Sequence, residues 1–154
     1  TDLSEKMVDY STQNLEWLQT RYKRSGTISV AQGDAMTHTW PRPIDAVVGE
    51  TYLGQPFSAP PSPQKLREVR GNCDHIISAF LTNIHDQLDP ETPLCLAVPA
   101  WRSASGTLTH LPFINSLEDL GYTRLRLTHV SNHDLIYYRE DQVVARELLL
   151  LQKT

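Results

Sequence analysis

The chain has 154 residues, of which 40% are hydrophobic and 21% are charged, and this composition predicts one folded domain with a buried core rather than a disordered polypeptide. The formal net charge of -4 argues against a surface dedicated to nucleic acid, because neutralising phosphates requires clustered Lys and Arg. Any contact with nucleic acid is therefore expected to be local or supplied by another part of the protein.

Residues 1–49 predict a helix followed by two strands. Ser4 suits the N-cap of a helix whose apolar residues recur mostly every three or four positions, and Gly26 is expected to end that helix. A β-rich run at residues 28–30 predicts a short strand. Residues 44–49 are nearly all apolar, which favours a strand buried on both faces.

A proline-rich loop and a long helix come next. Residues 50–63 contain four prolines and a glycine and are expected to form a shaped loop. From Lys65 to Leu88 the apolar residues trace one stripe, which predicts a helix. Residues 94–98 form another apolar run, which is typical of a buried strand.

The rest of the chain predicts a short helix, a strand and a hairpin. Residues 115–120 are expected to form a helix that ends at Gly121, a typical position for positive φ, before a strand at residues 125–129. Residues 135–139 and 143–151 flank a polar turn, and this arrangement predicts an antiparallel hairpin.

Strands and helices alternate along most of the chain. This alternation predicts an α/β fold with a mostly parallel sheet and helices on both of its faces, to which the C-terminal hairpin adds an antiparallel strand. In such sheets ligands bind beyond the carboxyl ends of the strands. Asp34, the loop after Glu50 and residues 99–102 are therefore expected to meet at one rim.

Neither a membrane span nor a metal site is expected. No apolar run approaches the about 20 residues that cross a bilayer, and the residues after Thr1 lack a signal-peptide core. Cys73 and Cys95 lie in apolar segments without the spacing of metal ligands, which predicts buried free thiols and a reducing, cytoplasmic setting. The six histidines also lack a regular ligand spacing and receive no role.

The order of these elements resembles that of the Rossmann-like methyltransferases. The features that match are Asp2 before the first helix, Gly33-Asp34-Ala35 after a strand, Glu50-Thr51-Tyr52-Leu53-Gly54 after the next strand, and the closing hairpin YYREDQVVARELLLLQK. Within that class the chain is most similar to the RNA methylases that modify the exocyclic amine of guanine in transfer and ribosomal RNA, usually beside a THUMP domain. DNA amine methylases look similar. The resemblance implies S-adenosylmethionine as cofactor and a nucleic acid as substrate, either RNA or DNA, with RNA preferred.

The resemblance runs from Asp2 to Lys153 and covers about the second half of a family member. Members carry, before the acidic residue matched by Asp2, a strand and a glycine-rich loop that cradles the methionine end of the cofactor. Residues 1–154 are therefore expected to be one incomplete Rossmann-like domain without its first strands, completed by an upstream region or by another chain. The isolated chain is expected not to bind the cofactor and to self-associate through exposed sheet edges.

By the resemblance, Asp2, Asp34 and Ala35 would hold the cofactor. The Asp2 carboxylate would accept hydrogen bonds from the ribose hydroxyls, and capping of the first helix is the alternative. The Asp34 carboxylate would accept the adenine amine, and the backbone at Ala35 would meet a ring nitrogen. A turn formed by Gly33 and Asp34 is the alternative for this pair.

The segment Glu50-Thr51-Tyr52-Leu53-Gly54 aligns with the family signature Asp-Pro-Pro-Tyr-Gly or Asn-Pro-Pro-Tyr, and only Gly54 matches outright. Methyl transfer requires the amine lone pair to be freed from ring conjugation and aimed at the methyl group. The resemblance implies that Glu50 accepts the amine protons and also lies at the cofactor. Tyr52 would stack on the flipped base with Phe57 as a second wall, and ordinary packing is the alternative for both rings.

At the same rim, Trp101 would stack on a base and Arg102 would contact a phosphate, with a buried Trp beside a surface Arg as the alternative. Two further hypotheses about function stay open. A degenerate methyltransferase that binds RNA or a partner protein without catalysis would explain the loss of both signature prolines from residues 50–54. Another Rossmann-like nucleotide-binding or regulatory domain is the third hypothesis, and the terminal hairpin argues against it.

Overall fold

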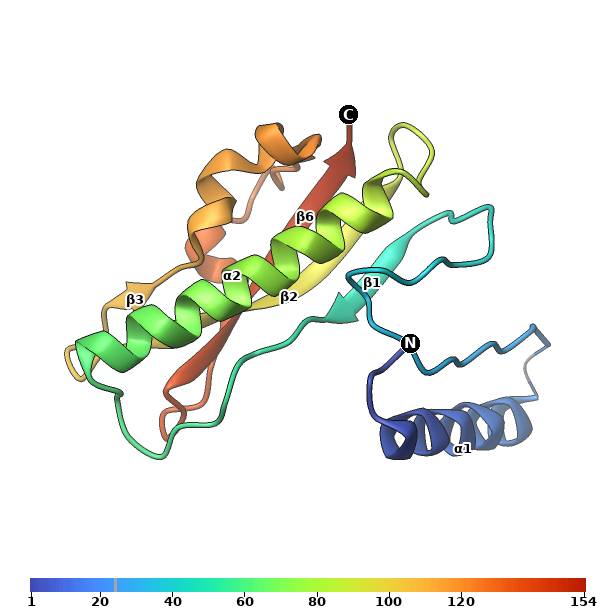
Figure 1. The fold of residues 1–154 in the computed structure, drawn as a ribbon, viewed down its shortest axis with the longest axis horizontal. Coiled ribbons are helices and arrows are strands. Elements are labelled where there is room, and N and C mark those ends of the chain that lie inside the picture. The colour runs from blue at the N-terminus through green and yellow to red at the C-terminus, as the bar shows by residue number, and fades with distance from the viewer. Residues whose placement is uncertain (24) are drawn as a thin grey trace. The chain divides into compact units, whose positions relative to one another are not determined.

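The computed structural model describes residues 1–23 and 25–154. They form two compact units, Thr1–Thr39 and Trp40–Thr154, which we call the N-terminal unit and the sheet unit (Figure 1). That residues 1–154 make up a single domain stays a prediction.

The N-terminal unit begins with the predicted helix, α1 (Glu5–Tyr22). Ser4 is its N-cap, and the Ser4 side chain makes no capping hydrogen bond. The carboxylate of Asp2 instead accepts a hydrogen bond of 2.8 Å from the backbone N–H of Ser4. The helix ends at Lys23, which adopts the left-handed conformation with φ of 48°. The prediction that Gly26 ends the helix is therefore wrong.

The strand predicted at residues 28–30 is absent from the described structure. A single parallel bridge joins Asp2 to Gln32. The N–H of Asp2 donates to the carbonyl of Ala31 over 3.2 Å, and the N–H of Gly33 donates to the carbonyl of Asp2 over 3.0 Å. This bridge cannot extend into a longer β-ladder, because the chain turns into α1 immediately after Asp2.

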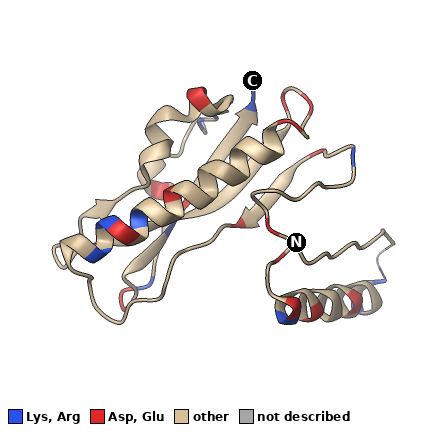
Figure 2. Cartoon of the chain, in the orientation of Figure 1, with Lys and Arg blue, Asp and Glu red and all other residues tan. Residues whose placement is uncertain are grey.

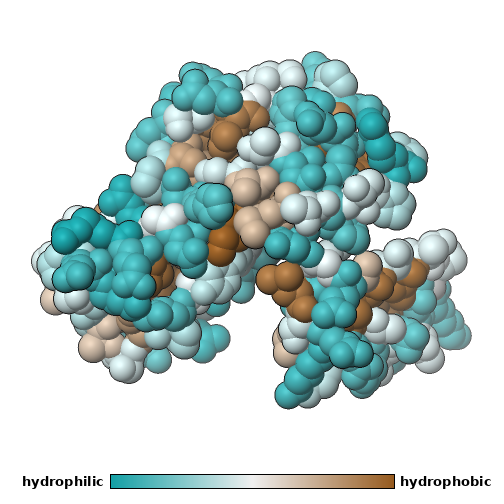
Figure 3. Space-filling view, in the orientation of Figure 1, coloured by the Kyte–Doolittle hydropathy of each residue, from teal (hydrophilic) through white to brown (hydrophobic). Residues whose placement is uncertain are grey.

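The large apolar side chains of α1 lie on the surface. None of the described residues of α1 is buried. The exposed fraction ranges from 36% to 61% for the residues Met7, Tyr10, Leu15, Trp17, Leu18 and Tyr22. Figure 3 shows brown, hydrophobic patches on the surface of the N-terminal unit. The periodic pattern predicted the helix correctly, but a unit this small contains too little chain to bury its apolar face.

The sheet unit is built on a mixed sheet, so the α/β class is confirmed. Its described strands are β1 (Val47–Glu50), β2 (Pro93–Arg102), β3 (Leu108–Thr109), β4 (Tyr122–Arg124), β5 (Ile136–Tyr137) and β6 (Val144–Lys153). The order across the sheet is β1-β2-β6-β4, with β3 paired to β2 and β5 paired to β6.

The prediction of a mostly parallel sheet is wrong. Among the described strands of the sheet, only β1 and β2 pair in parallel, through the α2 crossover, and the other pairs are antiparallel. The physical reason is the position of β6, which lies between β2 and β4 instead of at the edge. Because β6 runs in the opposite direction to both neighbours, it makes two antiparallel interfaces.

The long predicted helix is confirmed as α2 (Pro63–His85). Pro63 occupies its first turn, and the side chain of Ser62 accepts a capping hydrogen bond of 3.2 Å from the N–H of Lys65. Its apolar stripe is buried at Val69, Cys73, Ile77, Leu81 and Ile84. This stripe packs on the sheet residues Leu94, Leu96, Val98, Leu149 and Leu151 to form the core, and Figure 1 shows α2 lying across the sheet.

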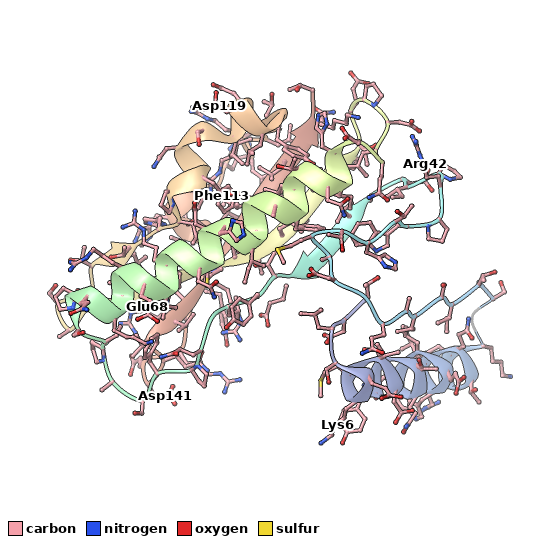
Figure 4. The ribbon with its side chains drawn as sticks, in the orientation of Figure 1. Lys6, Arg42, Glu68, Phe113, Asp119 and Asp141 are labelled. Atoms are coloured by element: carbon pink, nitrogen blue, oxygen red, sulfur yellow. The ribbon has the colours of Figure 1, made fainter. Side chains whose placement is uncertain are left out.

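A second helix, η1 (Pro112–Leu120), packs beside α2. Phe113 and Leu117 join the same core, and the backbone N–H of Phe113 donates to the carboxylate of Asp74 on α2 over 2.9 Å (Figure 4). Within the sheet unit α2 and η1 therefore contribute to the same core. The helix ends at Gly121 with φ of 78°, which confirms the predicted positive φ.

The strand predicted at residues 125–129 is wrong. Pairing with β6 starts at Tyr122, directly after Gly121, and the strand β4 ends at Arg124. Tyr122 is buried, and its hydroxyl donates to the carbonyl of Leu81 over 2.8 Å, which fixes the start of the strand against α2. The terminal hairpin is confirmed, because β5 and β6 pair in antiparallel register.

Among the residues that the structure describes, no helix is long and apolar enough to cross a membrane. Within the same residues, no group of three or more His, Cys, Asp or Glu side chains could hold a metal ion. Cys73 and Cys95 are free thiols, the first buried and the second partly buried.

Candidate functional site

Glu50 is the last residue of β1, and its carboxylate is held by Arg146 of β6. The Nε of Arg146 donates to Oε2 of Glu50 over 2.6 Å. Both side chains are partly exposed, at 51% for Glu50 and 30% for Arg146. Such a pair contributes at most about 1 kcal/mol to stability, because water screens it. Its main effect is to orient the Glu50 carboxylate, whose Oε1 has no partner among the described residues.

Thr51 continues the contact with β2 beyond the end of β1. Its backbone N–H and its hydroxyl both donate to the carbonyl of Ala97, over 2.9 Å and 3.1 Å. The hydroxyl is therefore used within the sheet, and it holds the start of the loop that follows.

Gly54 is required by its conformation and by its surroundings. Its φ is +81°, and an added Cβ would lie 3.0 Å from Cγ1 of Val69 and 3.1 Å from Sγ of Cys73. Any side chain here would be strained in the backbone and crowded by α2. The one outright match to the family signature is therefore the residue that lets the loop lie close against α2.

The loop after β1 and the terminal hairpin together line a hollow of about 270 Å³, which we call the loop–hairpin hollow. Its lining residues are Leu53, Gly54, Gln55, Pro56 and Phe57 from the loop and Asp141, Gln142, Val143, Val144 and Arg146 from the hairpin. Figure 4 shows Asp141 at the tip of the hairpin, near this loop. The volume lies near the lower end of small-molecule sites, so it fits a single planar ring system better than a whole cofactor.

Only some of the residues predicted for the site line the loop–hairpin hollow. Leu53 and Gly54 line it, and so does Phe57, the predicted second wall. Tyr52 is 47% exposed and is not among the lining residues. The stacking role of Tyr52 stays a prediction, but Phe57 is the ring that faces the hollow.

The contacts of Trp101 and Arg102 agree with the alternative given for them, in which the side chains pack within the protein. Trp101 is 1% exposed and belongs to the core. The guanidinium of Arg102 lies 3.9 Å from the ring centre of Tyr138. Its Nη1 donates to the carbonyls of Arg139 and Glu140 over 3.4 Å. Arg102 therefore fixes the turn of the terminal hairpin next to the loop–hairpin hollow.

The predicted cofactor acids of the N-terminal unit make local hydrogen bonds. Besides the capping contact of Asp2, the Asp34 carboxylate accepts from the N–H of Met36 over 2.9 Å, and the Asp34 carbonyl accepts from the N–H of His38 over 2.8 Å. Both alternatives, a capping acid and a turn, are thus present in the structure. The bridge between Asp2 and Gln32 also brings the two acids onto neighbouring segments. The cofactor roles of Asp2, Asp34 and Ala35 stay predictions.

The predicted rim is confirmed in part. Within the sheet unit, Pro99 pairs with Arg146, which is the partner of Glu50, so Glu50 and Pro99 lie at the same end of the sheet. Asp34 belongs to the N-terminal unit, and its meeting with Glu50 stays a prediction.

Glu147 of β6 is the centre of a charged cluster that the sequence patterns above did not predict. The Glu147 side chain is 4% exposed, and its two oxygens contact Nδ1 of His110 at 2.6 Å and Nη2 of Arg124 at 3.1 Å. Glu147 and His110 also line a second hollow of about 390 Å³. An acid at an inward position of an apolar strand was the available signal, because a buried carboxylate requires partners.

Searches against protein-family models and against curated proteins find no match to this chain. The methyltransferase family is therefore a resemblance based on the residues described above, and function has to be argued from the site.

Proposed function

We propose that the chain is an S-adenosylmethionine-dependent methyltransferase domain that acts on the exocyclic amine of a base in nucleic acid, RNA in preference to DNA. The observation that carries this proposal is the loop–hairpin hollow. The segment that resembles the family's catalytic signature follows β1, the parallel partner of β2, and its residues Leu53 and Gly54 line a hollow of about 270 Å³. Such strand ends are where ligands bind in α/β sheets.

Glu50 is the acceptor for the amine protons. Arg146 occupies Oε2 and orients the carboxylate, which leaves Oε1 for an N–H of the target amine. Accepting a hydrogen bond from this N–H favours the geometry in which the nitrogen lone pair is freed from the ring and directed toward the methyl donor. Leu53 and Phe57 supply apolar walls that would hold a flipped base, as base-modifying enzymes require.

The N-terminal unit supplies residue types that fit the adenosine part of the cofactor. Asp2 and Asp34 are acceptor-only groups, which match the ribose hydroxyls and the adenine amine. When bound, S-adenosylmethionine supplies an electrophilic methyl group on a positively charged sulfur. By the resemblance, Asp2 and Asp34 would bind the adenosine part.

We expect residues outside this chain to supply part of the positive charge that binds the nucleic acid. Figure 2 shows Lys and Arg interleaved with Glu on the first turns of α2, at Lys65, Arg67 and Glu68. Lys65 and Glu68 form an ion pair of 3.0 Å, which reduces the positive charge available to a phosphate. Together with the net charge of -4, this pattern supports substrate binding that is shared with another domain or chain.

The test measures methyl transfer from labelled S-adenosylmethionine to RNA and to DNA by the complete gene product. Cofactor binding is measured separately by calorimetry. Glu50→Gln is expected to lower the transfer rate about 100-fold, since it weakens the proton acceptor. Glu68→Gln is the matched control on exposed α2 and is expected to leave the rate unchanged. Absence of both transfer and cofactor binding in the unaltered protein would refute the proposal.

The second candidate is a methyltransferase-like domain that binds RNA or a partner protein without catalysis. The observation that favours it is the Glu50–Arg146 ion pair, because a carboxylate already bound to a guanidinium is a weaker proton acceptor. Cofactor binding without transfer to any RNA or DNA would select this candidate over the catalytic one.

A further inference from the structure

The second hollow, of about 390 Å³, is a candidate site separate from the loop–hairpin hollow. We call it the histidine hollow, because His110 and His133 both line it. Its β6 residue is Glu147, whereas the neighbouring Arg146 lines the loop–hairpin hollow. Successive residues of a strand point to opposite faces of a sheet, so β6 supplies the two hollows from different faces. The volume lies within the range of small-molecule sites.

Glu147 fixes the orientation of the His110 ring. The Glu147 side chain is 4% exposed, and its Oε2 lies 2.6 Å from Nδ1 of His110. An ionised carboxylate can only accept hydrogen bonds, so Nδ1 is the donor in this contact. The His110 side chain is 43% exposed, and its Nε2 has no hydrogen-bond partner among the residues that the structure describes. Nε2 is therefore the ring nitrogen that is left for a ligand.

Asn132 and His133 add further hydrogen-bonding groups to the histidine hollow. Both residues line it and are exposed, and neither side chain has a hydrogen-bond partner within the described part of the chain. A side-chain amide and protonated imidazoles donate hydrogen bonds, which is what an anion requires. Leu108 and Ile136 line the same hollow and are apolar. The lining thus suits a ligand that has an anionic group and an apolar part.

Glu147 does not make the histidine hollow negative, because its charge is balanced. Its Oε1 lies 3.1 Å from Nη2 of Arg124 on β4. The carboxylate of Asp134, which does not line the hollow, accepts from the N–H and the hydroxyl of Ser131 over 3.0 Å and 2.6 Å. When either imidazole is protonated, the lining groups and Arg124 together carry a net positive charge. The whole chain has a formal net charge of -4, so this positive charge is local.

We propose that the histidine hollow binds the phosphate group of an organic phosphate, with the imidazoles of His110 and His133 as donors. Leu108 and Ile136 would contact the organic part of the ligand. A metal ion is the other ligand that paired imidazoles favour, but the described residues offer no group of three His, Cys, Asp or Glu side chains that could hold one. The site does not depend on methyl transfer, and the phosphate could belong to a free nucleotide or to an RNA strand.

The experiment titrates the complete gene product, carrying ¹³C-labelled histidine, with inorganic sulfate, adenosine monophosphate and a short RNA, and follows the imidazole signals by NMR. Sulfate keeps its charge between about pH 6 and about pH 8, so a change in its affinity reports on the protein. We expect sulfate to bind about 10-fold more tightly at the lower pH, because protonated imidazoles donate to the anion. Tighter binding of RNA than of the nucleotide would identify a strand as the source of the phosphate, and the reverse would identify a free nucleotide.

His133→Asn is the main variant, because it removes one cationic donor from an exposed position and leaves the contacts of Glu147 intact. It is expected to lower the affinity for sulfate and for the nucleotide about 10-fold at the lower pH. His110→Asn is expected to have the same effect, with folding checked by circular dichroism because Glu147 loses a partner. His75→Asn, at an exposed position of α2 outside the hollow, is the matched control and should change nothing.

Three results would overturn this inference. The first is absence of binding of sulfate, nucleotide and RNA to the unaltered protein. The second is an affinity for sulfate that is the same at both pH values or the same in His133→Asn. The third is binding of Zn²⁺ that requires both histidines, without any binding of phosphate, which would assign the hollow to a metal ion. Each of these results leaves the proposed methyl transfer standing, because its residues do not line the histidine hollow.

Discussion

Glu147 provides the sharpest test of how the sheet unit is held together. Its side chain is 4% exposed on β6 and contacts both His110 and Arg124. Replacing it by Ala removes the carboxylate and leaves the Arg124 guanidinium, which is 18% exposed, without its anion. Removing one partner of a buried ion pair costs about 3–5 kcal/mol when the other partner stays fully buried.

Partial access to water reduces this cost. The His110 side chain is 43% exposed, so it can replace the lost contact with water, whereas Arg124 can do so only in part. We therefore expect Glu147→Ala to lower the free energy of unfolding by about 2–4 kcal/mol. For a chain of this size that loss corresponds to about 6–12 °C in melting temperature.

The assay is urea and thermal unfolding followed by circular dichroism. Glu68→Ala is the control, because the exposed pair of Glu68 with Lys65 contributes less than about 1 kcal/mol. A double-mutant cycle with Arg124→Ala should give a coupling energy of about 1–3 kcal/mol between Glu147 and Arg124. A loss for Glu147→Ala as small as that for Glu68→Ala would show that the cluster does not stabilise the fold.

Three further predictions concern the packing of α2. Gly54→Ala places a Cβ 3.0 Å from Val69 at a φ of +81°. This substitution should lower the free energy of unfolding, measured in urea, by about 1–3 kcal/mol. An unchanged free energy of unfolding would contradict the argument that a side chain at this position is strained. Tyr122→Phe removes the hydroxyl that donates to Leu81 and should cost about 1–2 kcal/mol in the same assay. Burial raises the pKa of the Cys73 thiol from 9.0 to about 11, so the stability contributed by its protonated form is full below pH 9.0 and is lost as the pH rises toward 11. Unfolding measured across that range should show the decline, and Cys73→Ser should flatten it. At pH 8 the Cys73 thiol should also react with iodoacetamide more slowly than Cys95, and equal rates would argue against burial.

The parts of the fold that could be predicted from the sequence are those set by local patterns. The stripe from Lys65 onward predicts α2 because a helix buries one face, and the apolar runs around the turn at residues 140–142 predict the terminal hairpin. Gly121 follows a short helical pattern, and its positive φ is a local property as well. None of these predictions requires knowledge of which strands become neighbours.

The prediction of a mostly parallel sheet failed, because the order of the strands depends on contacts far apart in the sequence. No pattern within residues 143–151 indicates that β6 lies between β2 and β4 rather than at an edge. The candidate site also depends on contacts between residues that are far apart in the sequence. Glu50 and Gly54 could be found from their place at the end of a strand and in the loop after it, whereas Arg146 becomes a candidate only when the hairpin lies beside that loop.

The ion pair between Glu50 and Arg146 joins residues that are 96 positions apart. Because Arg146 is on the reversed strand β6, the central position of β6 in the sheet is what brings a cation to the end of β1. A hairpin at an edge of the sheet would leave Glu50 without this partner and the loop–hairpin hollow without its hairpin wall. The feature of the fold that the sequence did not predict is therefore the feature that assembles the candidate site. Its chemistry depends on β6 being in register with β2, where Pro99 faces Arg146, as much as on the residues that resemble the catalytic signature.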